Sequence, residues 1–158
     1  MEGDLQQQTE ENIREERHLA RVIRQLALAD SPDECFKLAQ PDIEQRRVGR
    51  YISDLVQAHG ISKSAVIDAA GLSHSYGYDL MRGRCVRPGR DRLIMLSLGL
   101  NASLRETQHL LRLSGNTELW PRNTRDLAII YCLQRGMSRE ACDDVLFSLG
   151  EHTLLVAC

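Results

Sequence analysis

Serine and glycine divide most of the chain into short segments that have the apolar spacing of amphipathic α-helices. The segment after Ser103 is one example: it opens with the Ser-Leu-Arg-Glu pattern of a capping box and stops at Gly115. The alternation of β-branched and aromatic residues that is typical of strands is missing, and aromatic residues make up only 4% of the chain. Its 158 residues are enough to bury a core. We therefore predict an all-α protein with one main domain and additional helices.

The apolar spacing and the capping residues together predict the positions of the helices. Ser31 and Pro32 form a start signal with Glu34, and Pro41 is predicted to end the helix that begins there. The other predicted helices cover about residues 10–29, 43–58, 63–70, 73–81, 91–99, 104–113, 125–135 and 138–149.

The formal net charge of −2 hides an uneven distribution of charge. Residues 1–45 hold 11 acidic and 5 basic residues, a net charge of −6, whereas residues 46–92 hold 9 basic and 4 acidic residues, a net charge of +5. Residues 93–158 are close to neutral, at −1. Of the 20 basic residues, 18 are arginines. A basic segment therefore lies inside an otherwise acidic to neutral protein.

The basic segment contains a pattern of two short helices joined by a tight turn, residues 62–83. Gly71 stands where the chain must take a positive φ, which glycine adopts at low cost. Leu72 follows as an apolar residue under the turn, and Ser73 is a good N-cap for the second helix. This arrangement is typical of a helix-turn-helix, in which the second helix is presented to a DNA groove.

On these residues the sequence resembles the lambda-repressor-like, XRE-type helix-turn-helix family of bacterial and phage DNA-binding regulators, over about residues 46–101. The residues that match are Lys63, Val66, Gly71-Leu72-Ser73, Leu80 and Gly83. The resemblance implies an all-α helix-turn-helix bundle with additional N-terminal helices and a C-terminal helical extension. The chain then divides into an acidic helical arm, a helix-turn-helix DNA-binding domain and a C-terminal extension, which cover residues 1–42, 43–101 and 102–158.

The resemblance also implies a binding mode, in which a recognition helix at about residues 73–82 enters the major groove of double-stranded DNA. We expect the five arginines that follow this helix to lie along the phosphate backbone: Arg82, Arg84, Arg87, Arg90 and Arg92. If they neutralise about five phosphates, the slope of log K against log salt is about −4 to −5. The predicted DNA-binding residues are Lys63, Ser73, His74, Ser75, Tyr78, Arg82, Arg84 and Arg87.

Two positions depart from the family pattern. Ile67 stands where the family has a small alanine, and Gly77 stands where it has a branched apolar residue. A glycine inside a helix costs up to about 1 kcal/mol relative to alanine. Our hypothesis is that Gly77 makes room for Ile67, which exchanges bulk across the contact between the two helices.

The sequence gives no sign of catalysis, a cofactor or a metal. It contains no P-loop, GxGxxG, HExxH or GxSxG motif. Its five cysteines lack metal-ligand spacing and indicate free thiols in a reducing compartment. No apolar stretch is long enough to span a membrane, and the polar, acidic N-terminus is unlike a signal peptide. We expect a non-enzymatic, cytoplasmic bacterial regulator that associates with the nucleoid when it binds DNA.

Several alternatives remain open at this level. The same fold could serve as a helical protein–protein interaction module without DNA binding. The acidic N-terminal arm or the C-terminal helices could bind a protein partner, and the arm could also cover the arginine cluster as an intramolecular brake. The C-terminal helices could form a homodimer interface or pack back on the core of their own domain. The apolar residues available to them are Ile129, Ile130, Leu133, Val145, Leu146, Phe147 and Leu149.

Overall fold

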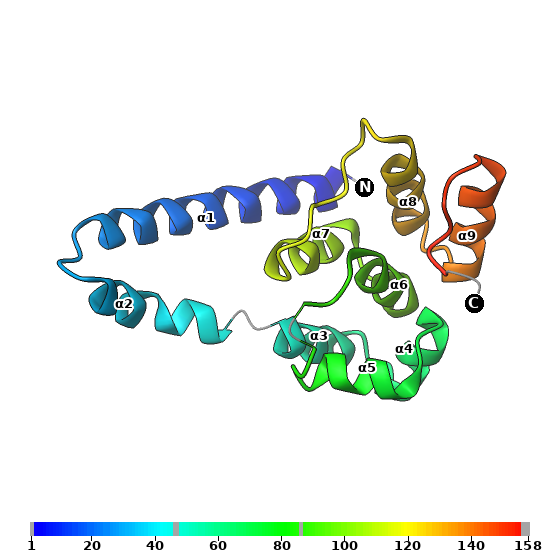
Figure 1. Ribbon diagram of the computed structural model, residues 1–158. Coiled ribbons are helices and arrows are strands. Elements are labelled where there is room, and N and C mark those ends of the chain that lie inside the picture. Colours follow the sequence, from blue (N-terminus) through cyan, green and yellow to red (C-terminus); the bar gives the residue numbers. More distant parts are fainter. Residues whose placement is uncertain (1, 46–47, 86, 156–158) are drawn as a thin grey trace. The chain divides into compact units, whose positions relative to one another are not determined.

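The computed structural model describes residues 2–45, 48–85 and 87–155, and within these ranges it contains nine α-helices and no strand (Figure 1). The prediction of an all-α protein is confirmed. Contacts divide the chain into two compact units: unit 1 is residues 1–46 and unit 2 is residues 47–158. In the part of the chain that is described, no helix is both long enough and apolar enough to cross a membrane.

Unit 1 is a helical hairpin in which α1 (Glu2–Ala27) and α2 (Pro32–Gln45) pack against each other around a short turn (Figure 1). The Ser31 hydroxyl accepts a hydrogen bond from the backbone N–H of Glu34 at 3.2 Å. The Glu34 carboxylate in turn accepts a hydrogen bond from the backbone N–H of Asp30 at 2.8 Å. These bonds satisfy backbone donors at the start of α2, and the predicted start at Pro32 is confirmed.

Other boundaries near unit 1 were predicted wrongly. α1 begins at Glu2 rather than near Glu10, because the polar residues before Ile13 are mostly good helix formers. α2 continues through Pro41, where a helix end was predicted, although a proline inside a helix costs about 3 kcal/mol. The helix predicted at 43–58 is therefore split: α3 is Val48–Ala58, and residues 46–47 lie outside the described residues.

Unit 2 is built around α6 (Arg90–Leu100), which is buried on most of its sides, as expected for a central helix. α4 (Lys63–Ala70), α7 (Leu104–Leu113) and α9 (Arg139–Ser148) pack directly on it. The bundle also contains α3, α5 (His74–Met81) and α8 (Thr124–Gln134). The buried apolar side chains of α6 are Leu93, Ile94, Met95, Leu96, Leu98 and Leu100.

Gly99 lies inside α6, which ends one residue beyond the predicted end at about residue 99. A Cβ atom at this position would lie 2.7 Å from the backbone nitrogen of Ala70 and 2.9 Å from the carbonyl oxygen of Val66. The glycine therefore allows the backbones of α6 and α4 to approach closely. Asn101 ends the helix instead, in the left-handed conformation with φ of 54°.

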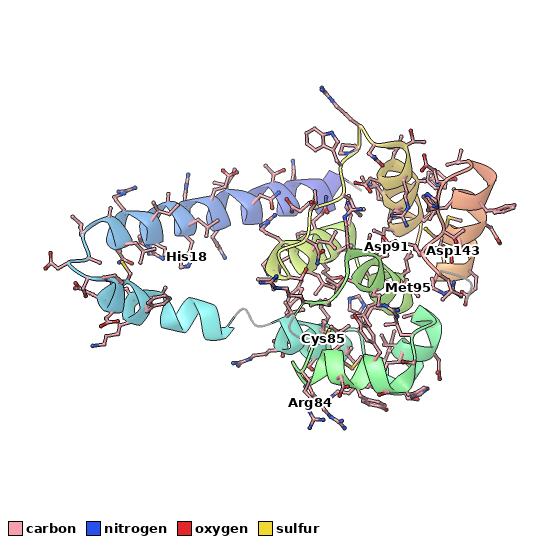
Figure 2. All side chains as sticks on the ribbon, viewed as in Figure 1. His18, Arg84, Cys85, Asp91, Met95 and Asp143 are labelled. Atoms are coloured by element: carbon pink, nitrogen blue, oxygen red, sulfur yellow. The ribbon has the colours of Figure 1, made fainter. Side chains whose placement is uncertain are left out.

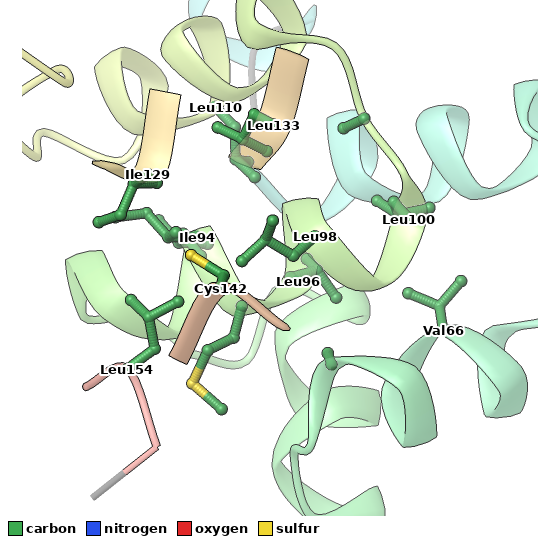
Figure 3. Close-up of a cluster of buried hydrophobic side chains, with 14 of the residues drawn as sticks. Val66, Ile94, Leu96, Leu98, Leu100, Leu110, Ile129, Leu133, Cys142 and Leu154 are labelled. Carbon is green, nitrogen blue, oxygen red and sulfur yellow. The ribbon is translucent and has the colours of Figure 1, made fainter. Parts of the chain in front are cut away.

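The C-terminal helices share the core of α6. Ile129 and Leu146 are fully buried, and Figure 3 shows Ile129, Leu133, Cys142 and Leu154 around the leucines of α6. Of the apolar residues considered for this extension, Ile129, Ile130, Leu133 and Leu146 pack on the core of their own unit, whereas Phe147 and Leu149 are exposed. The predicted bounds of α8 and α9 differ from the observed ones by one residue at each end, and the predicted capping box of α7 is confirmed.

Candidate functional site

The turn between α4 and α5 has the local geometry that the sequence predicts. The Ser62 hydroxyl caps α4 by accepting a hydrogen bond from the Ala65 backbone N–H at 3.2 Å. Gly71 then takes a φ of 72°, and its N–H donates to the Asp68 carbonyl at 3.0 Å. Leu72 is buried beneath the turn, and the Ser73 hydroxyl caps α5 by accepting from the Tyr76 N–H at 3.2 Å.

Ile67 and Gly77 meet where α4 contacts α5. Ile67 is fully buried, and a Cβ atom on Gly77 would lie 2.5 Å from its Cγ1 atom, 2.7 Å from Cδ1 and 2.9 Å from Cγ2. The isoleucine therefore occupies the space that a side chain at position 77 would need. This confirms the spatial part of the hypothesis that these two departures from the family pattern compensate each other.

The first turn of α5 is open to solvent. His74 and Ser75 are exposed, as is Lys63 at the start of α4. Tyr78 is half-buried and lies one turn further along α5. The centre of its ring lies 6.0 Å from the centre of the His74 ring and 5.5 Å from the guanidinium carbon of Arg82. Because a Tyr ring face attracts cations, Arg82 and Tyr78 form one continuous surface with the exposed end of α5.

Three of the predicted arginines follow α5 with their side chains exposed: Arg82, Arg84 and Arg87. Figure 2 shows Arg84 projecting away from the body of unit 2. Its Nη1 atom lies 3.7 Å from Oδ1 of Asp79, and its side chain is still 70% exposed. An exposed pair at this distance contributes little to stability, so the guanidinium is available to another anion. Val86, in the same loop, lies outside the described residues.

Arg90 does not belong to this exposed group, and the prediction that it contacts phosphate is wrong. Its Nη1 and Nη2 atoms donate to the two carboxylate oxygens of Asp126 at 2.9 and 2.8 Å. Its Nε atom donates to the Thr117 carbonyl at 2.8 Å, and Nη2 also donates to the Glu118 carbonyl at 3.1 Å. Arg90 therefore holds the connection between α7 and α8 against the start of α6.

The carboxylate of Asp126 is strongly bound by these contacts. Burial alone would raise the pKa of Asp126, but hydrogen bonds from Arg90 and from the Trp120 backbone N–H hold this pKa below its usual value. The side chains of Asp126 and Arg90 are 10% and 23% exposed. The pair is thus ionised at neutral pH and structural in character.

Arg92 is exposed, and its guanidinium group lies over an aromatic ring of α5. Its guanidinium carbon lies 4.8 Å from the ring centre of Tyr76. Burial raises the pKa of Tyr76 to about 12, and its contact with the Cys85 thiol adds to this effect. Because the phenol stays protonated, Arg92 is held by the face of a neutral aromatic ring rather than by a carboxylate.

Sequence reasoning missed two residues that lie beside this turn, Asp68 and Arg139. Nε2 of His74 lies 2.7 Å from Oδ1 of Asp68 across the turn, a contact that the six-residue separation could have suggested. Arg139 of α9 lies against Gly71, where a Cβ atom would be 2.6 Å from its Nε atom. Arg139 is buried and bonded to Glu140 and Asp143, and no local pattern indicates this long-range contact.

The described residues contain no cluster of metal ligands, and their cysteines are free thiols. No group of three His, Cys, Asp or Glu side chains there is arranged to hold a metal ion. Cys35, Cys85, Cys132 and Cys142 are free thiols. Burial raises the pKa of both Cys132 and Cys142, so these two thiols are protonated at neutral pH.

Comparisons of this chain with protein-family models, with curated proteins and with solved structures give no match.

Proposed function

We propose that the protein is a transcriptional regulator that binds double-stranded DNA through a helix-turn-helix of the lambda-repressor-like type, formed by α4 and α5. The observation that carries the proposal is the contrast between the arginines. Arg82, Arg84 and Arg87 stay exposed beside the open first turn of α5, whereas Arg90 is bound by a buried carboxylate. Exposed guanidinium groups beside a protruding helix suit a phosphate backbone, because each fork matches two phosphate oxygens.

In this proposal α5 lies in the major groove with His74 and Ser75 nearest the base edges. A serine hydroxyl donates or accepts, so it contacts several bases, and a histidine contacts guanine or phosphate. Tyr78 packs on a thymine methyl group or reaches a phosphate, while the hydroxyl of Ser73 keeps its capping role. Lys63 and the capped start of α4 face the opposite phosphate strand, as helix N-termini commonly do.

The sequence preference that follows is moderate. α5 carries no Arg, Asn or Gln in its first turn, and these are the residues that make bidentate contacts to guanine or adenine. His74 also shares its Nε2 atom with Asp68 at 2.7 Å, so a base that needs this nitrogen must compete with a carboxylate. Most of the affinity then comes from phosphate contacts.

Selection of bound sequences from a random DNA pool tests the proposal directly. Enrichment of a common motif by the full-length chain supports it, and the loss of enrichment in Arg84→Gln and Arg87→Gln variants assigns the contact. Arg122→Gln is the matched control, because Arg122 is also an exposed arginine but lies in the connection between α7 and α8, outside the helix-turn-helix. A pool without enrichment at low salt contradicts the proposal.

One observation favours the second candidate, a protein–protein interaction module. Leu127 and Tyr131 of α8 and Phe147 of α9 are 51%, 45% and 78% exposed, and such side chains are common in protein interfaces. The glycine inside α5 does not favour this candidate, since Gly77 is explained by its contact with Ile67. Specific capture of a protein with no DNA binding at any salt concentration would favour the module.

A further inference from the structure

The hairpin of unit 1 has no core of its own. Among its described residues, no side chain is buried, and Ile23, Leu28 and Phe36 are 66%, 81% and 65% exposed. Two helices that bury so little apolar surface gain too little to offset the entropy of ordering them. The hairpin therefore calls for a further surface that covers part of α1.

α2 covers only one side of α1. His18, Val22 and Leu26 are half-buried, and they follow one another at four-residue intervals on the same side of the helix. A different side carries a seam of residues separated alternately by three and four positions, the spacing of a coiled coil. Every residue of this seam is exposed: Ile13, Glu16, Ala20, Ile23 and Ala27.

α1 is also much longer than its neighbour. At a rise of about 1.5 Å per residue, its 26 residues extend over roughly 39 Å and the 14 residues of α2 over roughly 21 Å. About half of α1, the half nearer its N-terminus, therefore has no helix of unit 1 beside it. An isolated helical stretch of this length is marginal in water, so this half also calls for a partner.

The charges along α1 are separated by sign. Residues 2–16 contain six acidic residues and one arginine, whereas residues 17–27 contain three arginines and no acidic residue. Two copies of this helix in parallel would place like charges together. Two antiparallel copies place each acidic half beside a basic half, and the axes of packed helices, about 8–10 Å apart, are separated by about one screening length at physiological salt.

We propose that α1 pairs antiparallel with α1 of a second copy of the chain, around a two-fold axis beside Ile13. Glu10, Arg17 and Arg24 are seven residues apart, so they share one flank of the seam. In an antiparallel pair with this axis, Arg17 lies opposite Glu10 of the partner subunit. The symmetry repeats this contact, which gives two equivalent ion pairs beside the two copies of Ile13 at the axis. The proposal goes beyond DNA binding and does not depend on it.

Charge exchange in the full-length chain, measured by sedimentation equilibrium without DNA, tests this pairing. We expect wild-type protein to form dimers, and Arg17→Glu and Glu10→Arg each to weaken dimerisation by roughly tenfold or more, because each change turns both attractive pairs into repulsive ones. The double variant Glu10→Arg/Arg17→Glu restores attraction and dimerisation. An equimolar mixture of the two single variants forms a heterodimer for the same reason.

Arg21→Glu is the matched control, since it makes the same change of charge on the same helix at a position outside the seam and its flank. We expect it to change the dimerisation constant by less than about threefold. Circular dichroism verifies that every variant keeps its helical content. The proposal is overturned if the wild-type chain is monomeric at concentrations up to about 100 µM. It also fails if Arg17→Glu and Arg21→Glu weaken dimerisation equally, or if the double variant and the mixture remain monomeric.

Discussion

Replacing Gly77 by alanine adds one methyl group at a place that Ile67 already occupies. The new Cβ atom would lie within 3.0 Å of three atoms of this β-branched side chain, at 2.5, 2.7 and 2.9 Å. Because all three atoms are in the way, a rotation about one bond does not clear the space, and overpacking of this kind costs about 1–3 kcal/mol. Alanine regains up to about 1 kcal/mol of helix propensity. We expect Gly77→Ala to destabilise unit 2 by about 1 kcal/mol.

The double variant is the informative one. Ile67→Ala alone leaves a cavity at a fully buried site and costs about 3 kcal/mol. In Ile67→Ala/Gly77→Ala the clash is gone, the helix propensity is regained and the new methyl group fills part of the cavity, so the expected loss is only about 1–2 kcal/mol. The two changes added independently would cost about 4 kcal/mol. The predicted coupling energy is therefore about 2–3 kcal/mol in favour of the double variant.

Urea denaturation followed by tryptophan fluorescence measures these energies, because the single tryptophan, Trp120, lies in unit 2. Gly77→Ala combined with Leu146→Ala is the control pair, since Leu146 is equally buried but belongs to α9. We expect this control pair to be additive within about 0.5 kcal/mol. A Gly77→Ala variant more stable than wild type, or additivity of the Ile67 and Gly77 changes, would refute the reasoning.

Two other contacts give predictions for stability. Asp126→Asn should lower the free energy of unfolding by about 2–3 kcal/mol. This is less than the loss of one partner of a fully buried ion pair, because 23% of the Arg90 side chain is exposed. Asp144→Asn, at an exposed position, is the control and should have little effect. The pKa of Asp126 is lowered in the folded state, so the stability that its carboxylate contributes is complete above the unfolded pKa of about 3.9 and is lost as pH falls through the folded value. Thermal melts between about pH 6 and pH 2 measure this effect. The difference in melting temperature between wild type and Asp126→Asn should shrink below about pH 4. Gly99→Ala should lower the melting temperature by several degrees, because the new Cβ atom would lie 2.7 Å from the backbone nitrogen of Ala70. This clash should outweigh the better helix propensity of alanine. A rise in melting temperature would show that α4 and α6 can separate without cost.

Features that depend on near neighbours in the sequence were predictable. Ser62, Ser73 and Ser103 cap the helices that follow them, because a hydroxyl group needs only the backbone N–H three residues later. Gly71 was predictable for a similar reason, since a left-handed turn strongly favours glycine. The positions of α4 and α5 therefore follow from the sequence alone.

Features that depend on tertiary contacts were not predictable. Gly99 has the pattern of a helix end, but the approach of α4 keeps it inside α6. Arg90 has the same sequence context as the arginines beside it, and only Asp126, 36 residues away, separates it from them. In both cases the deciding partner is distant in sequence, where a periodic pattern carries no information.

The salt dependence of DNA affinity tests the central claim most directly. With Arg90 bound to Asp126, the exposed cations at the proposed interface are Lys63, Arg82, Arg84, Arg87 and Arg92. At about −0.9 per neutralised phosphate, the slope of log K against log salt should be about −4.5 per chain.

Arg87→Gln should change this slope by about +0.9, whereas Arg90→Gln should leave the slope unchanged in the fraction that is folded. Fluorescence anisotropy with a labelled duplex at several salt concentrations gives both values. A wild-type slope near zero would contradict the assignment of this surface to DNA. The assignment would also be contradicted if Arg90→Gln changed the slope by as much as Arg87→Gln does.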